Sequence, residues 1–123
     1  MAKVTGLGGV FFRTADRRSL GQWYQKWLGL PVEHPYGASI PHEQLSGKGY
    51  SVWAPFESET TYFGDSGQSY MINLMVDDLP GALEQVREGG AEVGPDTEDS
   101  EFGHFGWFVD PAGNRVELWQ PPV

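Results

Sequence analysis

Hydrophobic and polar positions follow two different periods along the chain, and these periods predict where helices and strands lie. Over residues 17–28, apolar side chains recur at spacings of three and four, as on one side of a helix: Leu20, Trp23, Tyr24, Trp27 and Leu28. Leu79, Leu83 and Val86 form a second stripe with the same period. Two amphipathic helices are therefore predicted, with their aromatic residues in the core.

The ends of both helices carry capping residues. Asp16 and Asp78 stand before the first turns, where a carboxylate can accept an otherwise unpaired backbone N–H. Gly29 suits the left-handed position that follows the first helix. Pro80 is tolerated in the first turn of the second helix, which the pair Gly89-Gly90 should end.

Alternation with a period of two predicts strands in the remaining parts of the chain. The main ones are residues 8–14, 50–54, 70–76, 103–109 and 114–120, and shorter ones are expected near 31–34 and 36–41. The stretch "DPAGN" at residues 110–114 has turn chemistry and should close a hairpin. Residues 54–69 form a long loop that mixes aromatic and acidic side chains, and long ordered loops of this kind often serve binding.

The same order of predicted strands and helix occurs twice along the chain. Asp16 and Asp78 lie 62 residues apart, and the helix-ending Gly29 and Gly90 lie 61 apart. A nearly constant offset between unrelated residue types indicates two copies of one unit, so we expect an α+β fold of two tandem βαβββ modules.

Strand alternation separates the side chains that face the helices from those that face away. If the hairpin folds about Ala112, Trp107 lies across from Glu117 and Phe105 lies across from Trp119. The predicted ligand-binding residues on the face turned away from the helices, with Phe56 of the following loop, are Phe11, Arg13, Trp53, Phe56, Met71, Asn73, Phe105, Trp107 and Trp119, and Glu117 lies among them.

Mostly apolar walls with a few polar groups are typical of a small-molecule site. The alternative is that the sheet closes on these aromatic side chains, which then fill an ordinary core. Arg13 and Glu117 could likewise form a structural ion pair across the face.

Composition narrows the classes of function. The 123 residues fit one domain, 1–123, with modules of about 6–56 and 69–121. There are no cysteines, which excludes disulfides, thiolate metal sites and a cysteine nucleophile. The net charge of −9 argues against nucleic acid or an anionic membrane as partner and is compatible with a cationic ligand. No apolar run approaches a membrane span and no signal peptide is recognisable, so we expect a cytoplasmic protein.

The two βαβββ modules, the "D…L…WY…LGL" signature of the first helix and the "DPAGNRVEL" ending resemble the vicinal oxygen chelate superfamily. This superfamily contains glyoxalases, bleomycin-resistance proteins and extradiol dioxygenases, and this chain is most similar to its small bleomycin-resistance-like branch. The resemblance covers nearly the whole chain. It implies a curved mixed sheet around a central cavity, and a homodimer.

In metal-using members of the superfamily, four strands each supply one ligand. Transfer of that pattern to this chain gives Gly9, Trp53, Met71 and Glu117. Glycine has no side-chain atom that could bind a metal, an indole N–H cannot act as a metal ligand, and a thioether binds hard metal ions poorly. We therefore expect no cofactor; a displaced site for nickel, zinc or manganese, using one of the histidines (His34, His42 and His104), is the alternative.

Three hypotheses follow. The first is a metal-independent protein that holds a small, aromatic or cationic molecule on its aromatic face. The second is a glyoxalase-type lyase or isomerase that uses Glu117 as its catalytic base or a displaced divalent metal. The third is a structural or regulatory module whose aromatic residues are simply core.

Overall fold

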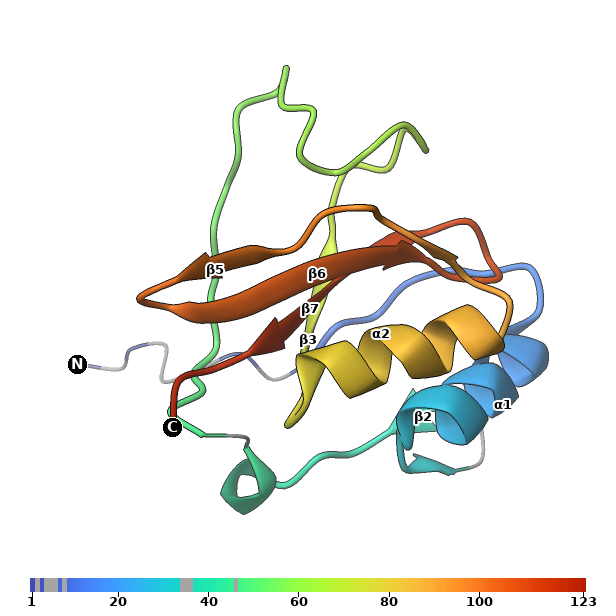
Figure 1. Cartoon of the computed structure of the whole chain (residues 1–123), viewed down its shortest axis with the longest axis horizontal. Helices are drawn as coiled ribbons and strands as arrows, with labels where there is room; N and C mark the ends of the chain where they lie inside the picture. Colours follow the sequence, from blue (N-terminus) through green and yellow to red (C-terminus); the bar gives the residue numbers. More distant parts are fainter. Residues whose placement is uncertain (2, 4–6, 8, 34–36, 46) are drawn as a thin grey trace.

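The chain has an α+β fold, as predicted, in a computed structural model that describes all residues except 2, 4–6, 8, 34–36 and 46 (Figure 1). In chain order, the described part contains α1 (Arg17–Leu28), β1 (Val32–Glu33), β2 (Gly37–Ala38), the short 3₁₀ helix η1 (His42–Gln44), β3 (Ile72–Met75), α2 (Leu79–Glu88), β4 (Glu92–Val93), β5 (Glu98–Ser100), β6 (Gly103–Val109) and β7 (Arg115–Gln120). Within this described part, no helix is long and apolar enough to cross a membrane.

Both helices begin at the predicted capping residues. The Asp16 carboxylate accepts the backbone N–H of Ser19 at 3.0 Å, and this bond lowers the pKa of Asp16. The Asp78 carboxylate accepts the N–H of Gly81 at 3.1 Å. Gly29 ends α1 with a φ of +64°, a left-handed conformation that glycine adopts without steric penalty.

The larger sheet has the strand order β3-β7-β6-β4, and β5 also pairs with β6. β3 runs parallel to β7, whereas β6 is antiparallel to β7, β4 and β5. The Asp110 carboxylate builds the turn between β6 and β7 by accepting the N–H groups of Ala112 and Asn114 at 3.0 Å each. This turn sets the predicted register, in which Trp107 pairs with Glu117 and Phe105 with Trp119.

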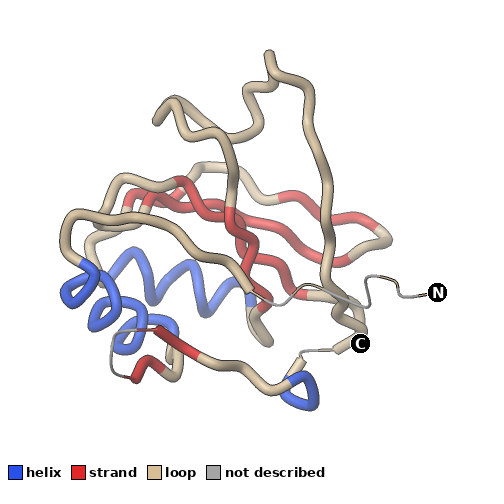
Figure 2. Tube along the Cα trace, turned by 180° about the vertical axis from the view of Figure 1, so that it is seen from behind, coloured by secondary structure: helices blue, strands red, loops and turns tan. Residues whose placement is uncertain are grey.

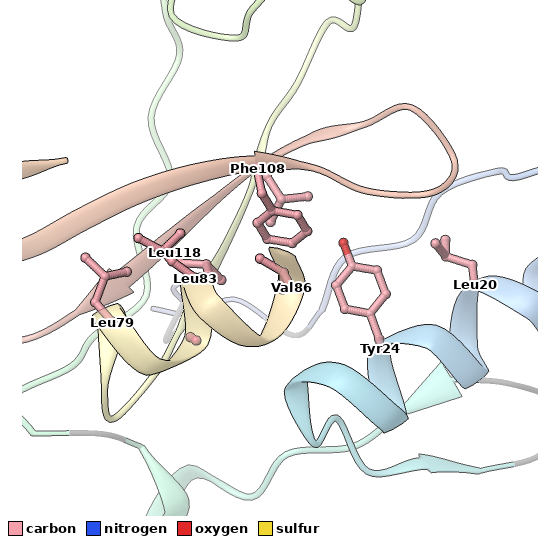
Figure 3. Packing of buried hydrophobic residues seen from close by; sticks show 9 residues of the cluster. Leu20, Tyr24, Leu79, Leu83, Val86, Phe108 and Leu118 are labelled. Atoms are coloured by element: carbon pink, nitrogen blue, oxygen red, sulfur yellow. The ribbon is translucent and has the colours of Figure 1, made fainter. Parts of the chain in front are cut away.

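Helices α1 and α2 cover one face of the sheet (Figures 1 and 3). Val86 of α2 and Leu118 of β7 are fully buried there, and Phe108 and Val116 are 1% exposed. Leu74 of β3 packs against the same cluster. Burial of these side chains supplies the main stabilisation of the fold, because each fully buried large apolar side chain contributes about 1.5–3 kcal/mol.

Two predicted strands are absent from the part of the chain that the structure describes. Residues 9–14 and 50–54 carry no strand pairing, and Phe11 and Trp53 are 95% and 83% exposed. An alternating pattern shows that one side of a segment is apolar, but a strand also needs a neighbour for its backbone groups. β1 and β2 instead form a separate two-stranded sheet, and β5 was not expected from the sequence.

Beyond residue 46, the long connection between η1 and β3 rises past the sheet and then runs on the side away from the helices (Figures 1 and 2). It includes the predicted loop 54–69. This loop therefore faces the same side of the sheet as the predicted ligand-binding residues of β6 and β7.

Candidate functional site

The site begins with a row of three side chains across three neighbouring strands. Asn73 of β3, Glu117 of β7 and Trp107 of β6 are paired in register and lie on the face away from the helices. The neighbours of Glu117 on β7, Val116 and Leu118, point into the core. Alternation along β7 thus places a carboxylate beneath the loop.

Glu117 is 7% exposed, and its two oxygens accept three hydrogen bonds from uncharged donors. Oε1 accepts from Nδ2 of Asn73 at 2.7 Å, while Oε2 accepts from Nε1 of Trp107 at 2.9 Å. The third donor is the hydroxyl of Tyr62, which also bonds Oε2. These bonds compensate the burial of the carboxylate, which would otherwise be strongly unfavourable.

Tyr62 belongs to the loop 54–69 and lies over this row. Burial raises the pKa of its phenol well above the ordinary value of 10, and the hydrogen bond to Glu117 and the negative charge of Glu117 raise it further. Tyr62 is therefore a neutral hydrogen-bond donor under ordinary conditions. Its ring meets Trp107 edge-on at 6.0 Å and stacks with Phe56 at 5.5 Å.

Two side chains hold the loop on β7. Gln68 accepts the backbone N–H of Arg115 at 2.8 Å and donates to the Arg115 carbonyl at 3.0 Å, so that it pairs with β7 as a strand would. Nε of Arg115 donates to the carbonyl of Tyr62 at 3.2 Å. At Gly64, which has a φ of +82°, a Cβ atom would come within 2.6 Å of the Arg115 side chain. The loop is thus fitted closely against this arginine.

The next row of the same face is aromatic. Phe105 and Trp119 lie parallel, with ring centroids 6.0 Å apart and an interplanar angle of 5°. Trp119 donates from Nε1 to the carbonyl of Phe102 at 2.7 Å, which fixes the orientation of the indole. Tyr50 meets Trp119 edge-on at 5.0 Å. We call Phe105, Trp107 and Trp119 the aromatic face.

The structure gathers only part of the predicted site. Asn73, Phe105, Trp107, Glu117 and Trp119 lie together on one face of the sheet, while Phe56 reaches them through Tyr62, and Met71 is partly buried just before β3. Phe11, Arg13 and Trp53 are exposed, outside any described strand. The proposed ion pair between Arg13 and Glu117 is wrong, because all the described partners of Glu117 are uncharged donors.

Sequence reasoning did not select Tyr62, Gln68 or Arg115 as site residues. Tyr62 lies 55 residues before its partner Glu117, so no local pattern connects them. The mixed aromatic and acidic composition of the loop indicated a binding role, but only Phe56 was selected from it. Arg115 shares the strand face of Glu117, and its guanidinium lies 5.4 Å from the centroid of the Trp107 ring, a cation–π contact.

In the described part of the chain, the side chains of the site do not fit a divalent metal. Among the described residues, no group of three or more histidine, aspartate or glutamate side chains could hold an ion. His42 lies exposed in η1, His104 pairs with Asp99 at 2.6 Å on the other face, and His34 falls outside the described residues. The oxygens of Glu117 are already engaged with O–H and N–H donors.

A hollow of about 370 Å³ lies elsewhere, between the end of α1 and the start of α2. It is lined by Leu28, Met75, Val76, Asp77, Asp78, Ala82 and Gln85. None of the predicted site residues is among them. The candidate site therefore lies apart from this hollow, on the face of the sheet beneath the loop 54–69.

Comparison with known proteins gives a consistent result. The model of the glyoxalase-like domain matches residues 9–119. No curated protein matches the chain.

Among solved structures, an integron cassette protein from the mobile metagenome of V. cholerae, VCH_CASS1, is 20% identical, with 98% of each chain covered and a TM-score of 0.57. A glyoxylase/bleomycin resistance protein/dioxygenase domain from Frankia sp. EAN1pec is 14% identical, with 97% of this chain and 99% of that chain covered and a TM-score of 0.58. TnmS3, an antibiotic binding protein from Streptomyces sp. CB03234, is 25% identical, with 88% of each chain covered and a TM-score of 0.51.

Proposed function

The chain belongs to the glyoxalase-like domain family, and from that premise we propose that it binds a small, planar aromatic or cationic molecule on its aromatic face without chemical conversion. The observation that carries this proposal is the parallel pair Phe105 and Trp119 beside the buried carboxylate of Glu117. Trp119 is only 5% exposed and backs the partly exposed ring of Phe105, so a conjugated ligand can stack on the Phe105 side of this pair. The likeness to an antibiotic binding protein at 25% identity supports the same function.

The donors around Glu117 favour binding over catalysis. A general base must have a free lone pair that can reach the proton of the substrate. Here Tyr62 and Trp107 both bond Oε2, Asn73 bonds Oε1, and the burial of Glu117 limits the access of a substrate to the remaining lone pair of Oε1. A lyase or isomerase that uses Glu117 requires Tyr62 to withdraw first, and it is therefore the second candidate.

We propose a homodimer for this protein on the basis of its exposed apolar residues. The stretches Leu7–Phe12 and Tyr50–Phe56 contain no charged residue, although the chain as a whole carries a charge of −9. Their large apolar side chains are exposed. Stretches of chain without backbone partners can form sheet with another copy of themselves. Two copies of this acidic chain repel each other, and the repulsion is smallest where their uncharged stretches meet.

Substitution of the stacking residues tests the binding proposal. In a fluorescence titration with acridine, a planar aromatic compound, Trp107→Ala and Trp119→Ala should each lower the affinity about tenfold or more. Trp53→Ala, which truncates an exposed tryptophan that is not one of the three residues of the aromatic face, is the control. Unchanged affinity in both face variants rules out stacking, and conversion of a bound compound, detected by mass spectrometry, favours the enzymatic alternative.

A further inference from the structure

We infer that Glu98 selects ligands that carry a positive charge, so that the ligand class of the aromatic face is planar aromatic cations. The inference deepens the proposed function and rests on it. Glu98 stands at the start of β5 and pairs in register with Phe105 of β6, so both side chains project from the same face of the sheet. Trp119, Phe105 and Glu98 form one row across β7, β6 and β5.

Glu117 is poorly suited to recognise a cation. It is 7% exposed and already accepts bonds from Tyr62, Asn73 and Trp107. A ligand cation would have to displace at least one of these donors and enter a buried site. Loss of an existing buried hydrogen bond offsets much of what the new contact contributes.

Glu98 differs from Glu117 in each of these respects. Its side chain is exposed, and within the described part of the chain its carboxylate has no hydrogen-bond or ion-pair partner. The adjacent Asp99 points to the other face and pairs with His104. Of these two acids, only Glu98 has an unpaired carboxylate among the described residues and lies next to Phe105.

The electrostatics of the site agree with this assignment. Burial and Glu117 are the main causes of the raised pKa of Tyr62, and the negative charge of Glu98 adds to them, in agreement with a place of Glu98 near the loop. Arg115, a cation on this face, lies over Trp107 in another row and contacts Tyr62. A ligand that stacks on the partly exposed ring of Phe105 therefore meets a negative charge at the β5 end of the row.

A matched pair of probes tests the inference. At pH 8, 9-aminoacridine is a planar cation, and acridine has the same ring system without the charge. Wild-type protein should bind the cation about fivefold more tightly, the size expected for an exposed ion pair. Glu98→Gln should remove this preference while leaving the affinity for acridine unchanged. Added salt should reduce the preference in wild type but not in the variant.

The control is Glu88→Gln, which removes the same charge from α2 on the other side of the sheet. Equal wild-type affinities for the two dyes, or a preference that survives Glu98→Gln or is lost equally in Glu88→Gln, would overturn the role of Glu98 while the aromatic face remains the binding site. Failure of both dyes to bind would contradict the proposed function, and the inference with it.

Discussion

Trp107 and Glu117 face each other across the β6–β7 pair, and the indole Nε1 of Trp107 donates a 2.9 Å hydrogen bond to Oε2 of Glu117. The same tryptophan thus contributes its N–H to a buried carboxylate and its ring to the aromatic face. This relationship couples the stability of the sheet to the geometry of the candidate site, and the coupling can be measured.

Glu117→Gln should destabilise the protein by about 1–3 kcal/mol, because an amide cannot accept hydrogen bonds at both of its ends. The N–H₂ group of the new glutamine would replace one of the two oxygens. Either Asn73, or Tyr62 and Trp107 together, would then have no acceptor for the hydrogen bond that they donate to Glu117. The change can be measured by urea denaturation. Glu98→Gln, at an exposed carboxylate, should change stability by less than about 0.5 kcal/mol. Equal urea midpoints for wild type and Glu117→Gln would show that the hydrogen bonds to Glu117 contribute little to the free energy of unfolding.

Tyr62→Phe should loosen the loop 54–69 while leaving the core intact. The variant keeps the ring contacts with Phe56 and Trp107 and loses the hydroxyl that bonds Glu117. We expect a loss of about 1 kcal/mol and faster amide exchange in the loop than in β6 and β7. Tyr70→Phe, at an exposed tyrosine, is the control. Exchange in the loop that matches wild type would contradict the anchoring role.

Two tyrosines should resist alkaline titration. Burial raises the pKa of Tyr24 and Tyr62 well above 10, and hydrogen bonds to Asp110 and Glu117, respectively, raise it further. Because the folded state binds these protons more tightly than the unfolded state, their contribution to stability is complete below pH 10 and decreases as the pH rises above it. Ultraviolet absorbance should show both phenols ionising only as the protein unfolds. Ionisation of all tyrosines before unfolding would be inconsistent with this assignment.

The exposed stretches around Phe11 and Trp53 predict the assembly state. Light scattering after gel filtration should show a dimer for wild type and a monomer for Phe11→Asp, because a charge opposes burial of this stretch. Phe102→Asp introduces the same charge at an exposed phenylalanine in the β5–β6 turn and should remain dimeric. A monomeric wild-type protein would contradict the proposal.

The sequence predicted those parts of the fold that local signals determine. The caps at Asp16 and Asp78 and the turn at Asp110 set both helices and the β6–β7 register, because each requires contacts only a few residues apart. The pairing of Trp107 with Glu117 therefore follows from the sequence alone.

Other features depend on contacts that local patterns do not encode. The bond from Tyr62 to Glu117 spans 55 residues. β5 has the sequence Glu-Asp-Ser, without the apolar alternation that marks a strand, so Glu98 could not be placed beside Phe105. Residues 9–14 and 50–54 have that alternation but no strand partner among the described residues, so their pattern alone led to an incorrect assignment.

The indole N–H resonances of the five tryptophans test the central claim most directly. In a ¹⁵N-labelled sample titrated with 9-aminoacridine, the signals of Trp107 and Trp119, assigned through Trp→Phe variants, should shift and saturate together. Trp23 and Trp27, which lie on α1 and pack against α2, should remain unchanged because the sheet separates them from the aromatic face. Shifts confined to Trp23, Trp27 or Trp53 would contradict binding at this face.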